Sequence, residues 1–308
     1  MSLEVLSVLV LFGLVGFLFV AYGVRVSLKG QAHFDRVNRQ GGSLLLSKSV
    51  MEVGYWLFQP LARLLVFCHV SANQISWASL VFGFLAACCL AFGHFGWGAI
   101  LATLSGMMDS LDGLVARFTG SASEAGEVLD ASIDRYVEFF FLGGLVIYYR
   151  EIPVLMILVL VALVGSFMVS YSTAKAEALQ IDPPHGSMRR PERALYLTLG
   201  AALSPLTISL FEDGERPFSI AIGHPMVLAI CLVAVVGNLS AIERLWSIAR
   251  AVRVREALGR GMAPAEISQD FPLQNFPKRR MPAGTEITAA TTQVSSPATA
   301  SAPKLTNP

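Results

Sequence analysis

The stretch Asp109-Ser110-Leu111-Asp112-Gly113-Leu114-Val115-Ala116-Arg117 determines how the rest of this chain is interpreted. On a helix, residues three, four, seven and eight positions after Asp109 share its face. These residues are Asp112, Gly113, Ala116 and Arg117. Gly126, Asp130 and Asp134 recur at every fourth position and share a face of the helix that follows. The two faces together predict a pocket where four carboxylates converge, and Gly113 and Gly126 would allow a close backbone or ligand approach.

Carboxylates this close together need a positive partner, because like charges repel strongly in a poorly solvated site. One or two divalent cations would meet that need. The oxygen-only donor set favours Mg²⁺, Mn²⁺ or Ca²⁺ over zinc, and no Cys or His lies within the motif. Arg117 would add a donor for a phosphate oxygen. A merely solvated helical surface is disfavoured, because the flanking residues are apolar and acids inside a membrane usually serve a function.

Composition places the chain among polytopic membrane proteins, because 54% of its 308 residues are hydrophobic and only 15% are charged. The net charge of +1 identifies no partner, and no nucleic acid is expected. The four cysteines lie in or beside apolar segments and form no C-x-x-C pair. They are expected to be small buried hydrophobes that form neither a disulfide nor a zinc site.

Apolar runs predict one extra N-terminal membrane helix and six core membrane helices. The extra helix covers residues 3 to 24 and lacks the positive start and cleavage site of a secretory signal. The first core helix is expected to run from a cap at Ser71 or Asn73 to about residue 90. The others are expected from about 97 through the motif and at about 126–149, 153–176, 194–211 and 220–242.

The segments between and beyond these helices differ in character. Residues 44–67 predict a helix lying along the membrane interface, with Pro60 kinking or restarting it. Either Ser71 or Asn73 would cap the first core helix, and capping is favoured over substrate contact for Asn73. The chain beyond Glu243 predicts a basic helical extension, and after about residue 281 its Ala, Thr, Ser and Pro predict a disordered tail.

Basic residues also predict the orientation in the membrane. The connections at 25–42, at 175–193 and after 243 are rich in Lys and Arg, whereas those at 93–96, 150–152 and 212–217 are not. Placing every basic connection on the cytoplasmic side satisfies the positive-inside rule. The aspartates then face the cytoplasm from a multi-pass protein of the cytoplasmic membrane.

Residues 109 to 134, written D-x2-D-G-x2-A-R-x8-G-x3-D-x3-D, resemble the signature of the CDP-alcohol phosphotransferases. Ser71-Ala72-Asn73-Gln74-Ile75-Ser76 is similar to the S/T-P-N-x-x-T start of the first helix in that family, with Ala72 where proline is usual. The resemblance implies a metal-dependent membrane enzyme, expected as a homodimer, in a domain spanning 43–248. Residues 1–42 and 249–308 would flank that domain.

The resemblance also implies roles for individual residues. Mg²⁺ or Mn²⁺, as two ions, would be held by Asp109, Asp112, Asp130 and Asp134. The CDP-alcohol would contact Asp112, Gly113, Ala116, Arg117, Thr119, Ser123 and Gly126. Asp134 would act as the base that takes the proton from the acceptor hydroxyl as this oxygen attacks the β-phosphorus of CDP-diacylglycerol and releases CMP.

A second cluster is basic and comprises Lys175, Arg189, Arg190 and Arg193. Anchoring by positive charge alone would explain it, but arginine forks also bind phosphate dianions well. The S-Y-x-x-A-K-A-E string at 170–177 and the later R-P-E-R resemble the branch that makes phosphatidylinositol phosphate from inositol phosphate. In that branch, a Lys and arginines at these places hold the acceptor phosphate. Arg189 and Pro183-Pro184-His185 depart from its pattern and leave the acceptor open.

Other functions remain as alternatives. Glycerol 3-phosphate, serine or another alcohol would be accepted by the same chemistry. A cation transporter would also place acids on adjacent membrane helices, but it has no need of Gly113, Ala116 and Arg117 in register. A membrane scaffold has no use for four buried acids.

Overall fold

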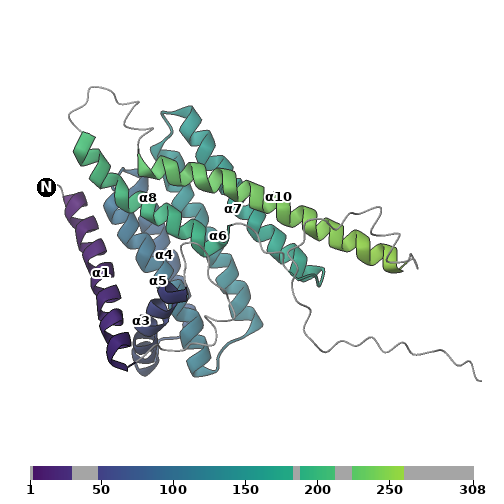
Figure 1. Ribbon diagram of the computed structural model, residues 1–308, viewed down its shortest axis with the longest axis horizontal. Coiled ribbons are helices and arrows are strands. Elements are labelled where there is room, and N and C mark those ends of the chain that lie inside the picture. The colour runs from purple at the N-terminus through teal and green to yellow at the C-terminus, as the bar shows by residue number, and fades with distance from the viewer. Residues whose placement is uncertain (1–2, 30–47, 183–187, 212–223, 260–308) are drawn as a thin grey trace, which may run out of the picture. The chain divides into compact units, whose positions relative to one another are not determined.

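The computed structural model describes residues 3–29, 48–182, 188–211 and 224–259, and every regular element within these ranges is a helix (Figure 1). The described residues up to 256 form one compact unit, and of the residues beyond it the structure describes 257–259. The helices are α1 (Leu3–Lys29), α3 (Lys48–Phe67), α4 (Ala72–Ala91), α5 (Phe95–Thr119), α6 (Glu124–Tyr148), α7 (Pro153–Ala178), α8 (Arg190–Phe211) and α10 (Pro225–Gly259).

Five of these helices are long and apolar enough to cross a membrane, namely α1, α4, α5, α7 and α10. The prediction of an all-α polytopic membrane protein is therefore confirmed. In α6, Asp130, Asp134 and Glu138 interrupt the apolar sequence. The number of seven membrane helices stays a prediction.

Local hydrogen bonds explain where several helices begin and end. Ser71, and not Asn73, caps α4 through a capping box with Gln74. Ser123 caps α6, and Gly120 closes α5 in the left-handed conformation, which glycine adopts without strain. Helix α8 begins at Arg190 and not near 194, because the Glu192 carboxylate accepts the Arg189 N–H at 2.8 Å and stabilises an additional first turn.

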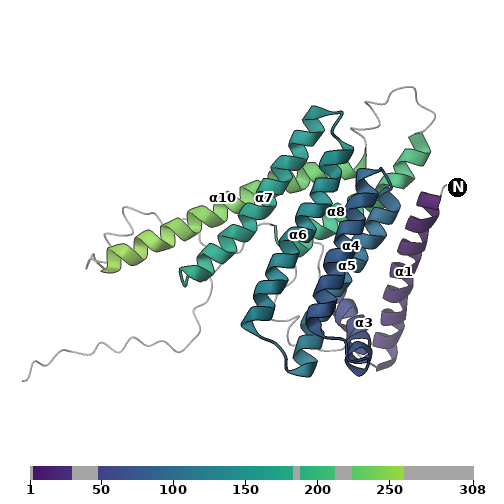
Figure 2. The ribbon, with the colours of Figure 1, turned by 180° about the vertical axis from the view of Figure 1, so that it is seen from behind.

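Helix α4 packs against both α5 and α6, and the three helices lie side by side in both views (Figures 1 and 2). Small residues allow this approach, because a Cβ added to Gly144 of α6 would collide with the backbone of Ala87. Between α4 and α5, the hydroxyls of Ser79 and Ser105 each donate to the other residue's carbonyl, at 3.0 and 2.8 Å. This packing fixes the relative positions of the helices that carry the aspartates.

Helix α1 lies along the unit and contacts α5, α8 and α3. Near its start, Glu4 accepts the Gly96 N–H at 2.7 Å and so caps α5 from another helix. Near its end, the Tyr22 hydroxyl donates to Glu52 of α3 at 3.2 Å. The N-terminal segment is thus an integral part of the helical unit.

Helix α10 packs on α7, where the Asn238 side chain donates to the carbonyl of Val161 at 2.9 Å. The predicted sixth core helix and the basic extension form this one continuous helix from Pro225 onward. All four cysteines are free. Cys68 is exposed and the other three are only half-buried, so the expectation of buried side chains is wrong, most clearly at Cys68. This exposure follows from its position immediately after the end of α3.

Several sequence-based expectations lie outside the described residues. They are the linker from 30 to 42, the start of the interface segment at 44–47, the Pro183-Pro184-His185 loop, the polar loop at 212–217, residues 220–223 and the tail.

Candidate active site

Three of the four motif aspartates converge. One carboxylate oxygen from each of Asp109, Asp130 and Asp134 lies within 4.8 Å of the other two. Asp109 comes from α5 and the other two come from α6, so two helices packed on α4 supply the cluster. Asp109 and Asp130 are half-buried and Asp134 is buried. A set of carboxylate oxygens in this arrangement fits a hard divalent cation such as Mg²⁺ or Mn²⁺.

Asp112 stands apart from this cluster. It is buried, and its Oδ2 accepts a hydrogen bond of 2.6 Å from the Ser76 hydroxyl of α4. Its Oδ1 accepts from the Gly113 N–H at 2.5 Å. Both carboxylate oxygens therefore already have a protein donor, and sequence reasoning did not anticipate that Ser76 supplies one of them.

Arg190 joins two members of the cluster. Its guanidinium donates to Asp109 Oδ1 from Nη1 at 3.4 Å and from Nη2 at 3.3 Å. The same Nη2 forms an ion pair with Asp134 Oδ1. Arg190 begins α8, so three helices meet at this point. A residue expected to bind an acceptor phosphate thus lies directly beside the acidic cluster.

Arg193, one turn further along α8, is fully buried. Its Nε donates to Glu138 Oε1 at 2.9 Å, and its Nη2 donates to the carbonyl of Ser166. Glu138 lies four residues after Asp134 on α6 and continues the spacing of Asp130 and Asp134. This four-residue spacing in the sequence predicts that Glu138 shares the helix face of Asp130 and Asp134, although the sequence analysis did not single it out.

The other basic side chains lie at the ends of α7 and α8. Lys175 is exposed near the end of α7, and Arg189 is half-buried just before α8. Arg244 of α10 is buried and donates to the Thr173 hydroxyl at 3.1 Å and to the Met188 carbonyl at 3.3 Å. Arg189 and Arg193 both interact with it electrostatically. The sequence placed Arg244 only in the basic extension beyond Glu243, yet its side chain joins α10 to this basic cluster.

The residues expected to contact the CDP-alcohol fall into two groups. Gly113, Ala116 and Arg117 share a face of α5, and a Cβ at Gly113 would lie 3.2 Å from the Arg117 guanidinium. Thr119 and Ser123 lie around the short connection to α6. The Thr119 hydroxyl donates to the Val115 carbonyl at 2.8 Å, and the Ser123 hydroxyl accepts from the Gly126 N–H at 3.1 Å. The second group therefore already shapes the connection between the two Asp-bearing helices.

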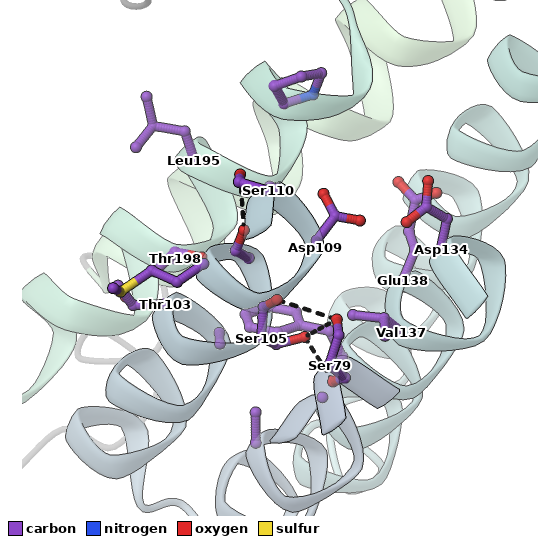
Figure 3. Close-up of a pocket in the computed structure, with 18 of the residues that line it drawn as sticks. Ser79, Thr103, Ser105, Asp109, Ser110, Asp134, Val137, Glu138, Leu195 and Thr198 are labelled. Atoms are coloured by element: carbon purple, nitrogen blue, oxygen red, sulfur yellow. Dashed lines mark hydrogen bonds between the residues drawn. The ribbon is translucent and has the colours of Figure 1, made fainter. Parts of the chain in front are cut away.

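A cavity of about 450 Å³ adjoins the acidic cluster (Figure 3). Asp109, Asp134, Glu138 and Arg190 contribute its charged wall. Hydroxyl groups and apolar side chains from α4, α5, α6 and α8, together with Phe58 of α3, form the remaining wall. The cavity thus offers a charged region and an apolar region to one ligand.

Comparison with known proteins agrees with this geometry. Residues 69–236 match the family model described as CDP-alcohol phosphatidyltransferase. Phosphatidylinositol phosphate synthase of Corynebacterium glutamicum is 31% identical over 163 residues, which cover 51% of this chain and 74% of that protein. The synthase of Cutibacterium acnes is 27% identical over 199 residues, covering 63% of this chain and 93% of that protein.

Solved structures show the same relationship. The crystal structure of Mycobacterium tuberculosis phosphatidylinositol phosphate synthase with CDP-DAG bound superposes with a TM-score of 0.53 at 25% identity. The match covers 62% of this chain and 92% of that chain. The structure of the same enzyme with manganese and citrate gives a TM-score of 0.54 at 26% identity. The family model spans more than half of the 308 residues and includes the whole Asp motif, so this chain belongs to the CDP-alcohol phosphatidyltransferase family.

Proposed function

We propose that this protein transfers the phosphatidyl group of CDP-diacylglycerol to inositol phosphate and releases CMP. The observation that carries the choice of acceptor is the basic cluster beside the acidic cluster, because a phosphorylated alcohol brings the negative charge that such a cluster binds. The curated relatives from C. glutamicum and C. acnes, both named phosphatidylinositol phosphate synthase, support the same choice.

The acidic cluster would hold the divalent ions, with Asp109, Asp130 and Asp134 as ligands and Asp112 completing the set. Bound there, Mg²⁺ or Mn²⁺ would neutralise charge on the diphosphate and on the departing CMP. Manganese in the related M. tuberculosis structure supports this assignment. For Asp112 to become a ligand, it would have to share or release the Ser76 hydroxyl.

The two substrates would occupy different regions of the site, the CDP-alcohol beside the Asp motif and the acceptor beside the basic cluster. The cytidine and diphosphate would lie against Gly113, Ala116 and Arg117, with Thr119, Ser123 and Gly126 shaping that end. The apolar part of the adjoining cavity offers space for part of the diacylglycerol, because Ala86, Phe141 and Leu197 line it. The acceptor phosphate would be held by Lys175, Arg189 and Arg190. Arg193 would support these residues by anchoring the first turns of α8 to Glu138. Arg244 of α10 would add positive charge.

Asp134 would act as the base. Its carboxylate would take the proton of the acceptor hydroxyl while that oxygen bonds to the β-phosphorus, and the bond from this phosphorus to the CMP oxygen would break. Its position on the cavity wall, which Asp109 and Glu138 also line, supports this role (Figure 3). The proposal includes a cytoplasm-facing site and a homodimer, supported by the basic connections and by the family resemblance.

CMP release from CDP-diacylglycerol by the purified protein tests the proposal. With Mg²⁺ present, inositol 1-phosphate, free inositol, glycerol 3-phosphate and serine are tried in parallel. Asp134→Asn serves as the inactive reference, and Glu151→Gln, at an exposed turn, controls for loss of a carboxylate. CMP release with inositol 1-phosphate alone supports the proposal. Release with another acceptor but not with inositol 1-phosphate overturns it and identifies the true acceptor.

A further inference from the structure

Arg190 lies where the proposed metal site and the proposed acceptor-phosphate site meet. It comes from the basic cluster, yet its guanidinium is bound to Asp109 and Asp134. These are two of the three carboxylates that lie within 4.8 Å of one another. It contacts Oδ1 of Asp109 and Oδ1 of Asp134, and so it is bound to two of the three carboxylates that a divalent ion would need as ligands.

The guanidinium and a divalent ion would compete for these oxygens. Arg190 brings one positive charge to three close carboxylates and so balances part of their negative charge. An ion on the same oxygens would stand beside the guanidinium, and the two positive groups would repel each other strongly in this partly buried site. Filling the metal site therefore favours the departure of the Arg190 side chain from Asp109 and Asp134.

The backbone around Arg190 is fixed, so a side-chain movement suffices. Glu192 accepts the N–H of Arg189 at 2.8 Å, and the buried ion pair of Arg193 with Glu138 holds the next turn. Arg190 itself stands at the start of α8, where its long side chain has several rotamers available. A guanidinium that leaves the carboxylates here needs a new anion, because Arg135 already contributes positive charge that repels Arg190.

We infer that Arg190 exchanges partners during the reaction cycle. It balances the acidic cluster while the metal site is empty, and metal binding transfers it to the phosphate of the acceptor. Binding of metal and binding of acceptor phosphate are then coupled, and each strengthens the other by the same factor. The part of this inference that concerns the acceptor rests on the proposed function, whereas the competition between Arg190 and the metal does not.

The first experiment measures Mn²⁺ binding by calorimetry to the full-length protein in lipid nanodiscs without substrate. Arg190→Gln removes the competing charge and is expected to bind Mn²⁺ on the order of tenfold more tightly than the parent protein. Arg190→Lys keeps a charge at this position and is expected to fall between the two. Arg150→Gln, which removes an equal charge from an exposed turn, is expected to leave the affinity unchanged. Equal or weaker Mn²⁺ binding by Arg190→Gln overturns the inference.

The second experiment measures the coupling directly. Binding of inositol 1-phosphate, and separately of inorganic phosphate, is measured with and without Mn²⁺. The parent protein is expected to bind phosphate several-fold more tightly when Mn²⁺ is present, and Arg190→Gln is expected to lose most of that gain. If the full gain persists in Arg190→Gln, the ion itself contacts the phosphate and the transfer of Arg190 is wrong.

Failure of the proposed function would look different. A protein that releases CMP only with an unphosphorylated acceptor refutes the acceptor assignment, while the Mn²⁺ affinities still report whether Arg190 competes with the metal. If Arg190→Gln does not fold, Arg190→Lys and the phosphate affinities of the parent protein decide. Absence of any Mn²⁺ effect on phosphate binding in the parent protein then overturns the inference.

Discussion

The hydroxyl of Ser76 donates a 2.6 Å hydrogen bond to Asp112, joining the first turns of α4 to the Asp motif of α5. Both side chains are buried. The bond fixes the carboxylate of an aspartate that stands outside the three-membered cluster. Ser76 is thus a positioning residue for the motif, contributed by a helix that carries none of its acids.

Removing the Ser76 hydroxyl is therefore expected to affect catalysis. Ser76→Ala leaves a buried carboxylate oxygen without its donor, at a cost of about 1.5–3 kcal/mol. We expect kcat/KM for CDP-diacylglycerol to fall roughly tenfold, which corresponds to about 1.4 kcal/mol. Ser76→Thr keeps the hydroxyl and should retain most activity, and Ser132→Ala, on an exposed face of α6, is the control. Parent-like kinetics for Ser76→Ala would show that Asp112 needs no such donor.

The pair formed by Glu138 and Arg193 is expected to matter for stability. Glu138→Ala leaves the fully buried Arg193 without its carboxylate, and breaking a buried pair in this way costs roughly 3–5 kcal/mol. Denaturant unfolding in detergent measures the loss. Glu151→Ala breaks the exposed pair with Arg150 and should cost no more than about 1 kcal/mol.

Replacing both members of the buried pair refines this prediction. Glu138→Gln combined with Arg193→Met removes both charges, so its cost should be smaller than the sum of the two single changes. Strict additivity, or a Glu138→Ala protein as stable as the Glu151→Ala protein, would count against a structural ion pair.

Glu4 is expected to stabilise the unit without affecting the chemistry. Its carboxylate accepts the Gly96 N–H at 2.7 Å, and His94, the cap residue of α5, makes no side-chain capping bond of its own. Glu4→Ala should therefore lower stability by about 1 kcal/mol. Gly96 lies 13 residues before Asp109, or about 20 Å along a helix, so kcat should stay unchanged. A large loss of kcat at full stability would instead link α1 to the chemistry.

Removal of divalent metal is expected to stop turnover. The cluster of Asp109, Asp130 and Asp134 offers only oxygen ligands, which suit Mg²⁺ or Mn²⁺. EDTA should therefore abolish activity, and adding Mg²⁺ or Mn²⁺ should restore it. The measurement is CMP release before chelation, after chelation and after adding each metal back. Full activity after exhaustive chelation would refute the metal site.

The Asp134 carboxylate is expected to be needed for the chemical step itself. Asp134→Asn should abolish turnover and leave binding of CDP-diacylglycerol largely intact, because the amide cannot accept the acceptor's proton at neutral pH. Turnover and binding of the CDP-lipid are measured on the same preparation. Equal turnover in the mutant and the parent would remove Asp134 from the mechanism.

The local sequence determined the helical membrane class of this protein and the starts of several helices. Apolar runs predicted the helical membrane class, and residues such as Ser71 and Ser123 mark helix starts through bonds within one turn. The helical repeat alone puts Asp130 and Asp134 on one face of α6. The prediction that carboxylates of the two Asp-bearing helices converge holds for Asp109, Asp130 and Asp134, whereas the fourth, Asp112, lies outside the cluster. The family signature added roles for the same positions.

Only the tertiary structure decided which side chains meet across helices. Arg190 and Arg193 lie three residues apart and looked alike in sequence, yet one joins Asp109 and Asp134 and the other is buried against Glu138. Asp112 shares a helix face with Asp109 but turns to Ser76, a residue 36 positions away. Helical periodicity fixes which residues share a face, whereas the partner that a charged side chain meets depends on how neighbouring helices pack and which groups they bury.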